Sequence, residues 1–252
     1  MLETCLVIPD CHRPWHHVRA YNLMLEVGTF IKPKHVILLG DYADVYNLSG
    51  HGPKDPGMIT NMKREIDSVN EGLDELDKLF PKSKKKYIEG NHEWRLTRYI
   101  QNRAPELFGV MDWEGLTSLK ERKGWEWVPW EPTQLTPIGP SKSKLLARHR
   151  PLGSSMKASA QRALCSMVYG DNHKIEETHF TSIKGEEHVC FSVGWLGDKR
   201  QQQVFGYVAG MAQWQLGFGI VHVDPRTGYF YHEKIHILDN ITCMVNGKRF
   251  KG

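Results

Sequence analysis

The stretch Leu6–His12, LVIPDCH, joins an apolar run to a carboxylate and an imidazole. The apolar run is typical of a buried strand, and side chains two residues apart share one face of an extended chain. Asp10 and His12 can therefore bind one metal ion, because carboxylate oxygens and ring nitrogens are both common ligands. This stretch predicts a metal site at the end of a sheet strand.

Two further apolar runs end in polar side chains in the same way. Val36–Asp41 reads VILLGD, and Lys86–His92 reads KYIEGNH. A glycine frees the backbone to turn where each of these strands ends. Open α/β sheets collect their ligands at the carboxyl ends of strands. Three such strand ends in succession therefore predict one shared crevice.

Two later polar positions complete the set. An isolated His149 follows one apolar run, and Gly170–His173, GDNH, follows another. The five polar strings together supply enough oxygen and nitrogen ligands for two metal ions.

In this order, the five strings resemble the motifs of the calcineurin-like metallophosphoesterases, which are D-x-H, G-D-x-x-D, G-N-H-[D/E], a lone histidine and G-H-x-H. The resemblance covers residues from about 6 to 194, and the layout also looks similar to phage-borne members of the family. It implies an α/β fold of two packed, mostly mixed β-sheets flanked by helices, a four-layer sandwich. Residues 1–252 would form a single domain.

The resemblance also implies that the ligands divide between two metal sites that share one bridging carboxylate. The first metal site would be Asp10, His12 and His173, the second metal site would be Asn91, His149 and Asp171, and the bridge would be Asp41. Asn91 would bind through its amide oxygen, because its nitrogen has no free lone pair. Manganese is the expected metal, with iron, zinc or magnesium as alternatives.

The sequence departs from the family pattern at three positions. Asp171 replaces the first histidine of G-H-x-H, and a hard anionic oxygen shifts the second metal site toward manganese or magnesium, or toward partial occupancy. Arg13 and Arg150 replace glycines that follow D-x-H and the lone histidine. Two guanidinium groups favour phosphate binding, because their planar forks match its oxygens. The alternative is that both arginines pair with surface carboxylates.

Phosphoester hydrolysis is the activity that the resemblance implies, with two cations roughly 3.5–4 Å apart. His92 is not a ligand in the family. It would donate a proton to the leaving group, and Asp44 would hold the tautomer of its ring. The alternatives are a phosphomonoesterase acting on phosphoproteins or small molecules, and a binding scaffold that has lost turnover through Asp171.

The proposed ligands also have structural interpretations. Aspartates at strand ends, such as Asp10 and Asp41, often cap helices or turns. His149 and His173 could be buried histidines whose hydrogen bonds are satisfied within the protein. Asp171 could hydrogen-bond to a ligand rather than bind the metal.

Two features bear on the class of substrate. Val45 stands where protein Ser/Thr phosphatases resembling this family carry an arginine, which argues against a phosphoprotein. The basic run Lys82–Lys86 and a group of tryptophans favour single-stranded nucleic acid or nucleotides, because bases stack on aromatic rings. The group is Trp113, Trp125, Trp127 and Trp130. The alternative is a solvated lysine turn beside tryptophans of a core or edge strand.

Composition is compatible with an enzyme and sets its expected location. The chain has 252 residues, a net charge of +4 and five cysteines without paired spacing, which favours reduced thiols in a cytoplasm. That cytoplasm would be the host's if a phage encodes the protein. A signal peptide and an apolar run long enough for a bilayer are both missing from the sequence, so no membrane partner is expected.

Periodicity predicts alternating helices and strands. The expected helices are 17–31, 59–80, 94–102 and 156–166, and the expected later strands are 174–183, 187–194, 217–224 and 229–238. A hairpin turn is expected at 225–228. The later strands are predicted to form a largely antiparallel sheet.

Overall fold

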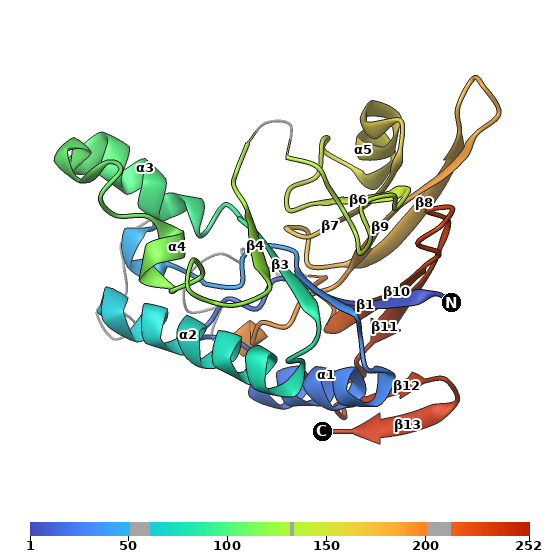
Figure 1. The fold of residues 1–252 in the computed structure, drawn as a ribbon, viewed down its shortest axis with the longest axis horizontal. Coiled ribbons are helices and arrows are strands. Elements are labelled where there is room, and N and C mark those ends of the chain that lie inside the picture. The colour runs from blue at the N-terminus through green and yellow to red at the C-terminus, as the bar shows by residue number, and fades with distance from the viewer. Residues whose placement is uncertain (51–60, 132–133, 201–212) are drawn as a thin grey trace.

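The computed structural model describes residues 1–50, 61–131, 134–200 and 213–252 (Figure 1). Its first sheet has the strand order β11-β10-β1-β2-β3-β4. The parallel strands are β1 (Glu3–Ile8), β2 (His35–Leu38), β3 (Lys84–Ile88) and β4 (Trp125–Val128). The antiparallel strands are β10 (Gly217–Val223) and β11 (Phe230–His236).

The second sheet has the strand order β5-β6-β7-β9-β8. Its parallel strands are β6 (Leu145–Arg148), β7 (Ser166–Tyr169) and β9 (Glu187–Val193), and its antiparallel strands are β5 (Thr136–Pro137) and β8 (Ile175–Thr181). A small hairpin of β12 (Thr242–Val245) and β13 (Lys248–Lys251) forms a separate sheet, and its buried side chains join the core cluster of the first sheet and the helices.

The alternation of side chains along β1 shows how the two sheets pack. Cys5 and Val7 belong to a buried cluster that contains Val168 and Phe191 of the second sheet. The intervening residues of β1 belong to a different cluster, formed with the helices. Side chains of a strand point alternately to opposite faces. The two sheets therefore pack face to face, and β1 is buried on both sides.

Helices cover the outer faces of both sheets. α1 (Val18–Ile31) and α2 (Met62–Leu79) lie along one side of the molecule, and α5 (Met156–Ala163) lies on the opposite side (Figure 1). The remaining helical segments are η1 (Tyr46–Leu48), α3 (Trp94–Arg103), η2 (Pro105–Leu107) and α4 (Trp113–Leu116). The predicted α/β fold of two packed sheets flanked by helices is confirmed.

The predicted helices are found with small differences at their ends. His17 caps α1, and Asn61 caps α2 by accepting a hydrogen bond from the N–H of Arg64. The first two residues of the predicted helix 59–80 lie outside the described residues. The prediction 156–166 was too long, because Leu164 adopts a left-handed backbone conformation that ends α5.

The predicted antiparallel sheet was wrong in one respect. The later strands do not stay together, because β10 pairs with β1 and extends the first sheet, whereas β8 and β9 complete the second. Without β10, β1 would leave an open row of backbone hydrogen-bonding groups at the centre of the molecule.

The predicted patch of lysines and tryptophans was also wrong for most of its members. Trp113 lies in the hydrophobic core, and Trp125 and Trp127 pack against it. Lys85 and Lys86 are buried on β3, where they form ion pairs with carboxylates of α2 and β4. These side chains are used within the fold and do not form a nucleic-acid surface.

A search of the described helices for membrane spans found none with the required length and apolarity.

Candidate metal centre

The carboxyl ends of the parallel strands bring the five polar strings together. Asp10, Asp41 and Asn91 follow β1, β2 and β3, and His149 and Gly170 follow β6 and β7. The N–H groups of Cys11 and His12 donate to the carbonyl of Asp41 at 3.0 and 2.9 Å, which joins the first two loops. Residues that are far apart in sequence thus meet at one edge, as expected for this kind of sheet.

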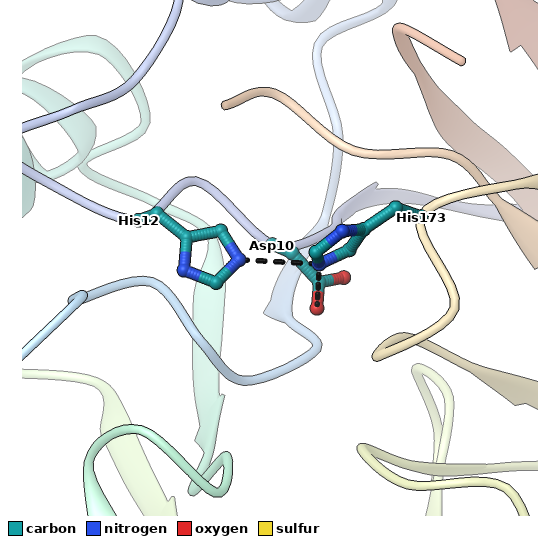
Figure 2. A group of neighbouring side chains, drawn as sticks. All are labelled: Asp10, His12 and His173. Atoms are coloured by element: carbon teal, nitrogen blue, oxygen red, sulfur yellow. Dashed lines mark hydrogen bonds and ion pairs between the residues drawn. The ribbon is translucent and has the colours of Figure 1, made fainter. Parts of the chain in front are cut away.

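Asp10, His12 and His173 form the first group of ligand atoms (Figure 2). The Nε2 atoms of the two histidines are 3.2 Å apart, and Asp10 Oδ1 is 3.5 Å from Nε2 of His173. His12 Nδ1 lies 3.3 Å from a carboxylate oxygen of Asp44, which leaves Nε2 directed at the group. Asp10 Oδ2 is buried and has no hydrogen-bond partner among the residues described. A bound cation would satisfy these atoms.

Asp10, Asp41 and His149 form the second group, with Asn91 beside them. His149 Nε2 is 3.3 Å from Asp41 Oδ1 and 3.0 Å from Asn91 Oδ1. The Nδ1 of His149 lies 2.7 Å from the carbonyl of Leu39, and because a carbonyl only accepts, this nitrogen carries the proton. In the neutral ring, the lone pair of Nε2 and the oxygen of Asn91 are close enough to act as adjacent ligands of one cation.

The electrostatics of this second group favour positive charge. Burial lowers the pKa of His149, but the carboxylates of Asp41, Asp10 and Asp171 outweigh it and raise the pKa to about 10. The negative potential that holds a proton on a buried imidazole would also attract a divalent cation. Oxygen and nitrogen donors in this combination fit manganese, iron or zinc.

The glycines of the motifs allow the strings to approach closely. Gly40 has a φ of +95°, and an added Cβ would lie 2.5 Å from Nδ1 of His149. At Gly90 an added Cβ would lie 2.2 Å from the backbone nitrogen of Asp41. Neither site accepts a side chain without displacing a candidate ligand, so the glycine turn at Gly40 predicted from sequence is confirmed.

Asp171 lies at the edge of the second group. Its Oδ1 is 4.0 Å from His149 Nε2, its Oδ2 is 3.8 Å from Arg150 Nε, and its side chain is 26% exposed. Its N–H donates to Asp10 at 2.9 Å, which ties the loop to the first group. Burial raises the pKa of this carboxyl group. Metal binding by Asp171 stays a prediction, while Arg150, 58% exposed, lies beside Asp171.

His92 forms a third group of ligand atoms with His12 and Asp44, and its ring is held by the main chain. Its N–H donates to Asp41 Oδ1 at 2.9 Å, and its Nδ1 donates to the carbonyl of Asp44 at 2.8 Å. The carboxylate of Asp44 is farther from this nitrogen, at 3.7 Å, than from Nδ1 of His12. Asp44 therefore fixes the tautomer of His92 through its backbone carbonyl, and its carboxylate lies farther from the ring.

Arg95 is a site residue that the sequence interpretation missed. Its Nη2 lies 3.0 Å from Nε2 of His92, its Nη1 donates to the carbonyl of Asp44 at 2.8 Å, and only 6% of the residue is exposed. Burial lowers the pKa of His92, and the charge of Arg95 acts in the same direction. The spacing of three residues on a helical turn was the signal that could have linked these two residues.

Arg13 does not face the site as predicted. Its guanidinium donates to the carbonyl of Ser68 and to Glu75 on α2, both at 3.1 Å, and lies 4.5 Å from the ring centroid of Tyr21. The residue is 4% exposed. Phosphate binding by Arg13 is therefore not supported, because its guanidinium is already packed against tyrosine rings and bonded to the helix.

Glu93 is the last residue of the G-N-H-E string, and in the structure its carboxylate bonds to two loops of the site. Its carboxylate accepts hydrogen bonds from the N–H groups of Asp41, Ala43 and Gly90 at 2.9–3.0 Å and from the hydroxyl of Tyr87 at 2.8 Å. These contacts hold the loops after β2 and β3 together. Burial raises the pKa of Glu93 to about 7.

Replacing Glu93 with glutamine is expected to lower the free energy of unfolding by about 1–3 kcal/mol, because the amide NH2 would face donors and leave one buried group unsatisfied. Urea unfolding measures the change. Glu106→Gln, at an exposed position on η2, is the matched control and should change stability little. Equal losses in the two variants would contradict the role assigned to Glu93.

No family model matches the sequence, and no curated protein is similar to it. Among solved structures, the phosphoesterase YfcE from E. coli is similar over 92% of this chain and 98% of its own, at 14% identity and a TM-score of 0.42. Vps29 from Chaetomium thermophilum is similar over 99% of this chain and 96% of its own, at 13% identity and a TM-score of 0.46. These are similarities of whole chains at low sequence identity.

Proposed function

We propose that this protein is a two-metal-dependent phosphoester hydrolase of the calcineurin-like metallophosphoesterase type. The observation that carries the proposal is the meeting of two buried groups of ligand atoms that share Asp10, the second of which contains Asp41. In the second group, His149 Nε2 and Asn91 Oδ1 face each other at 3.0 Å. The surrounding carboxylates hold a proton on His149 in the metal-free protein, and a bound cation would replace that proton with Nε2 and the Asn91 oxygen as ligands.

The proposed ligands follow the two groups. Asp10, His12 and His173 would hold the first metal, Asn91, His149 and Asp171 the second, and Asp41 both. Manganese is the metal proposed, because Asp171 adds a hard anionic oxygen where the family has a ring nitrogen. Two divalent cations, when bound, supply the positive charge that stabilises a phosphoryl transition state.

The other residues would handle the proton and the substrate oxygens. His92 is held by the carbonyl of Asp44 and by Arg95, so its ring has one orientation beside Asp41. From there it would deliver a proton to the leaving oxygen once its Nε2 has gained a proton and released the hydrogen bond from Arg95. Arg150 is exposed beside Asp171, where its guanidinium would bind a phosphate oxygen. The proposed substrate is a phosphodiester of a nucleic acid or nucleotide.

Hydrolysis of bis(p-nitrophenyl) phosphate tests the proposal. Manganese should activate protein that has been stripped with EDTA, and renewed chelation should abolish turnover, since the charge at the site is lost. Faster cleavage of the monoester p-nitrophenyl phosphate would instead identify a phosphomonoesterase. If neither ester is cleaved and the protein retains no manganese after dialysis, the enzyme proposal is wrong. Manganese binding without turnover would identify a binding scaffold.

A further inference from the structure

Trp94 and Trp130 form a pair of stacked rings beside the second metal site. Their centroids are 6.0 Å apart with an interplanar angle of 26°, and the ring of Trp130 is 6.2 Å from that of His149. Trp94 is the first residue of α3, and Trp130 follows β4. Both side chains are partly exposed. Two distant segments of the chain therefore place an aromatic surface next to a candidate metal ligand.

This pair is not part of the described hydrophobic core. Trp113 is a core residue, and Trp125 and Trp127 pack against the core, whereas Trp94 and Trp130 belong to none of the buried clusters of the described residues. Large aromatic rings that remain partly exposed next to a polar site commonly mark a binding surface. Packing alone does not account for their position.

The backbone under Trp130 is anchored to the candidate metal centre. The N–H of Trp130 donates to the buried carboxylate of Glu89 at 2.6 Å. The side-chain amide of Gln134 donates to the carbonyls of Glu89 and Pro129 at 3.1 and 2.9 Å and accepts from the N–H of His149 at 3.2 Å. Trp130 and His149 are thus connected through one side chain, which gives the ring a defined place relative to the site.

Positive charge borders the tryptophan pair. The guanidinium of Arg98 lies 5.6 Å from the ring centroid of Trp94. Arg150 directly follows His149 in the chain and is 58% exposed beside Asp171. An aromatic face next to arginines suits a ligand that combines a flat ring with a negative charge. A nucleobase joined through its sugar to a phosphate has these properties.

Building on the proposed function, we infer that Trp94 and Trp130 form a base-stacking subsite that selects nucleoside-bearing phosphodiesters. The scissile phosphate would lie at Asp41 and His149, and the base would stack on the indole surface. Base stacking is tolerant of sequence, because every base has a π-face. The subsite would therefore favour nucleotides as a class over simple alkyl esters.

Two esters with the same leaving group test this inference. The p-nitrophenyl ester of thymidine 5′-phosphate carries a base, and methyl p-nitrophenyl phosphate does not. In the wild-type protein with manganese, kcat/KM should be roughly ten- to a hundredfold higher for the thymidine ester, which is the range expected for stacking one base. Trp130→Ala should bring the ratio of the two values close to one, and Trp130→Phe should restore part of it.

Trp125→Phe is the matched control, because Trp125 bonds to Asp77 on α2 and should not change the ratio. If Trp130→Ala does not fold, Trp94→Ala provides the same test. Equal rates for both esters in the wild type, or an unchanged ratio in the folded alanine variant, would overturn the subsite and leave the proposed hydrolase intact. If neither ester is cleaved, the proposed function fails and the subsite with it.

Discussion

Replacing Asp41 with asparagine is expected to lower kcat for bis(p-nitrophenyl) phosphate roughly a thousandfold. The reason is that bound metal ions lower the activation free energy at the phosphate by several kcal/mol. Asp41 would be the ligand common to both metals, and asparagine keeps its size but removes the negative charge. Asparagine also tolerates the φ of +47° at this position, and its oxygen can still accept from the N–H of His92. The loss should therefore come from the site and not from misfolding.

Asp112→Asn is the matched control for this variant. Asp112 caps α4 at an exposed position, and its replacement should leave turnover unchanged. Steady-state kinetics at saturating manganese measure both variants, and circular dichroism checks their folding. An Asp41→Asn protein that is folded and retains wild-type turnover would contradict the bridging role.

Replacing His92 with alanine is expected to lower kcat about 10²- to 10⁴-fold for diesters with poor leaving groups, the range for losing a general acid. Diesters that release p-nitrophenolate should be affected much less, because this anion leaves without a proton. Metal content should stay at the wild-type level, because neither of the two proposed metal sites uses His92 as a ligand. Leaving-group dependence of kcat, together with metal analysis, measures the effect.

His236→Ala provides the control for loss of an imidazole, since His236 is exposed on β11. It should leave both the kinetics and the metal content unchanged. Loss of bound manganese from His92→Ala would show that His92 is itself a ligand. A uniform loss of turnover across all leaving groups would instead show that His92 acts by positioning.

The convergence of the candidate ligands could be predicted because of how parallel strands align. Ile8 pairs with Leu38, and Leu38 pairs with Tyr87, so β1, β2 and β3 end at nearly the same level. Polar residues that follow each apolar run then reach the same edge of the sheet. Local sequence carries this information, since strand ends and glycine turns are visible in the chain itself.

The roles of Glu93, Arg95 and Arg13 depend on contacts between distant segments. Glu93 accepts from the N–H of Asp41, which lies 52 residues earlier in the chain. Arg95 is near His92 in the chain, but it also donates to the carbonyl of Asp44, which lies 51 residues earlier. Arg13 is directed to α2 by Ser68 and Glu75. No local pattern states which partner a charged side chain will meet.

The burial of the lysine run could not be predicted from local sequence either. A sequence of consecutive lysines indicates a solvated surface, yet Lys85 is paired with Asp77, and Lys86 with Glu126, on either side of β3. Alternation along a buried strand sends neighbouring residues to different faces. Of the stacked tryptophans Trp94 and Trp130, only Trp130 belonged to the predicted group.

Anomalous diffraction from crystals grown with manganese tests the central claim most directly. Two manganese peaks are expected on either side of the Asp41 carboxylate. One should contact Asp10, His12 and His173, and the other should contact Asn91 and His149, with the distance to Asp171 showing whether that carboxylate binds. No peak among these residues, or a single peak that Asp41 does not contact, would contradict a two-metal centre.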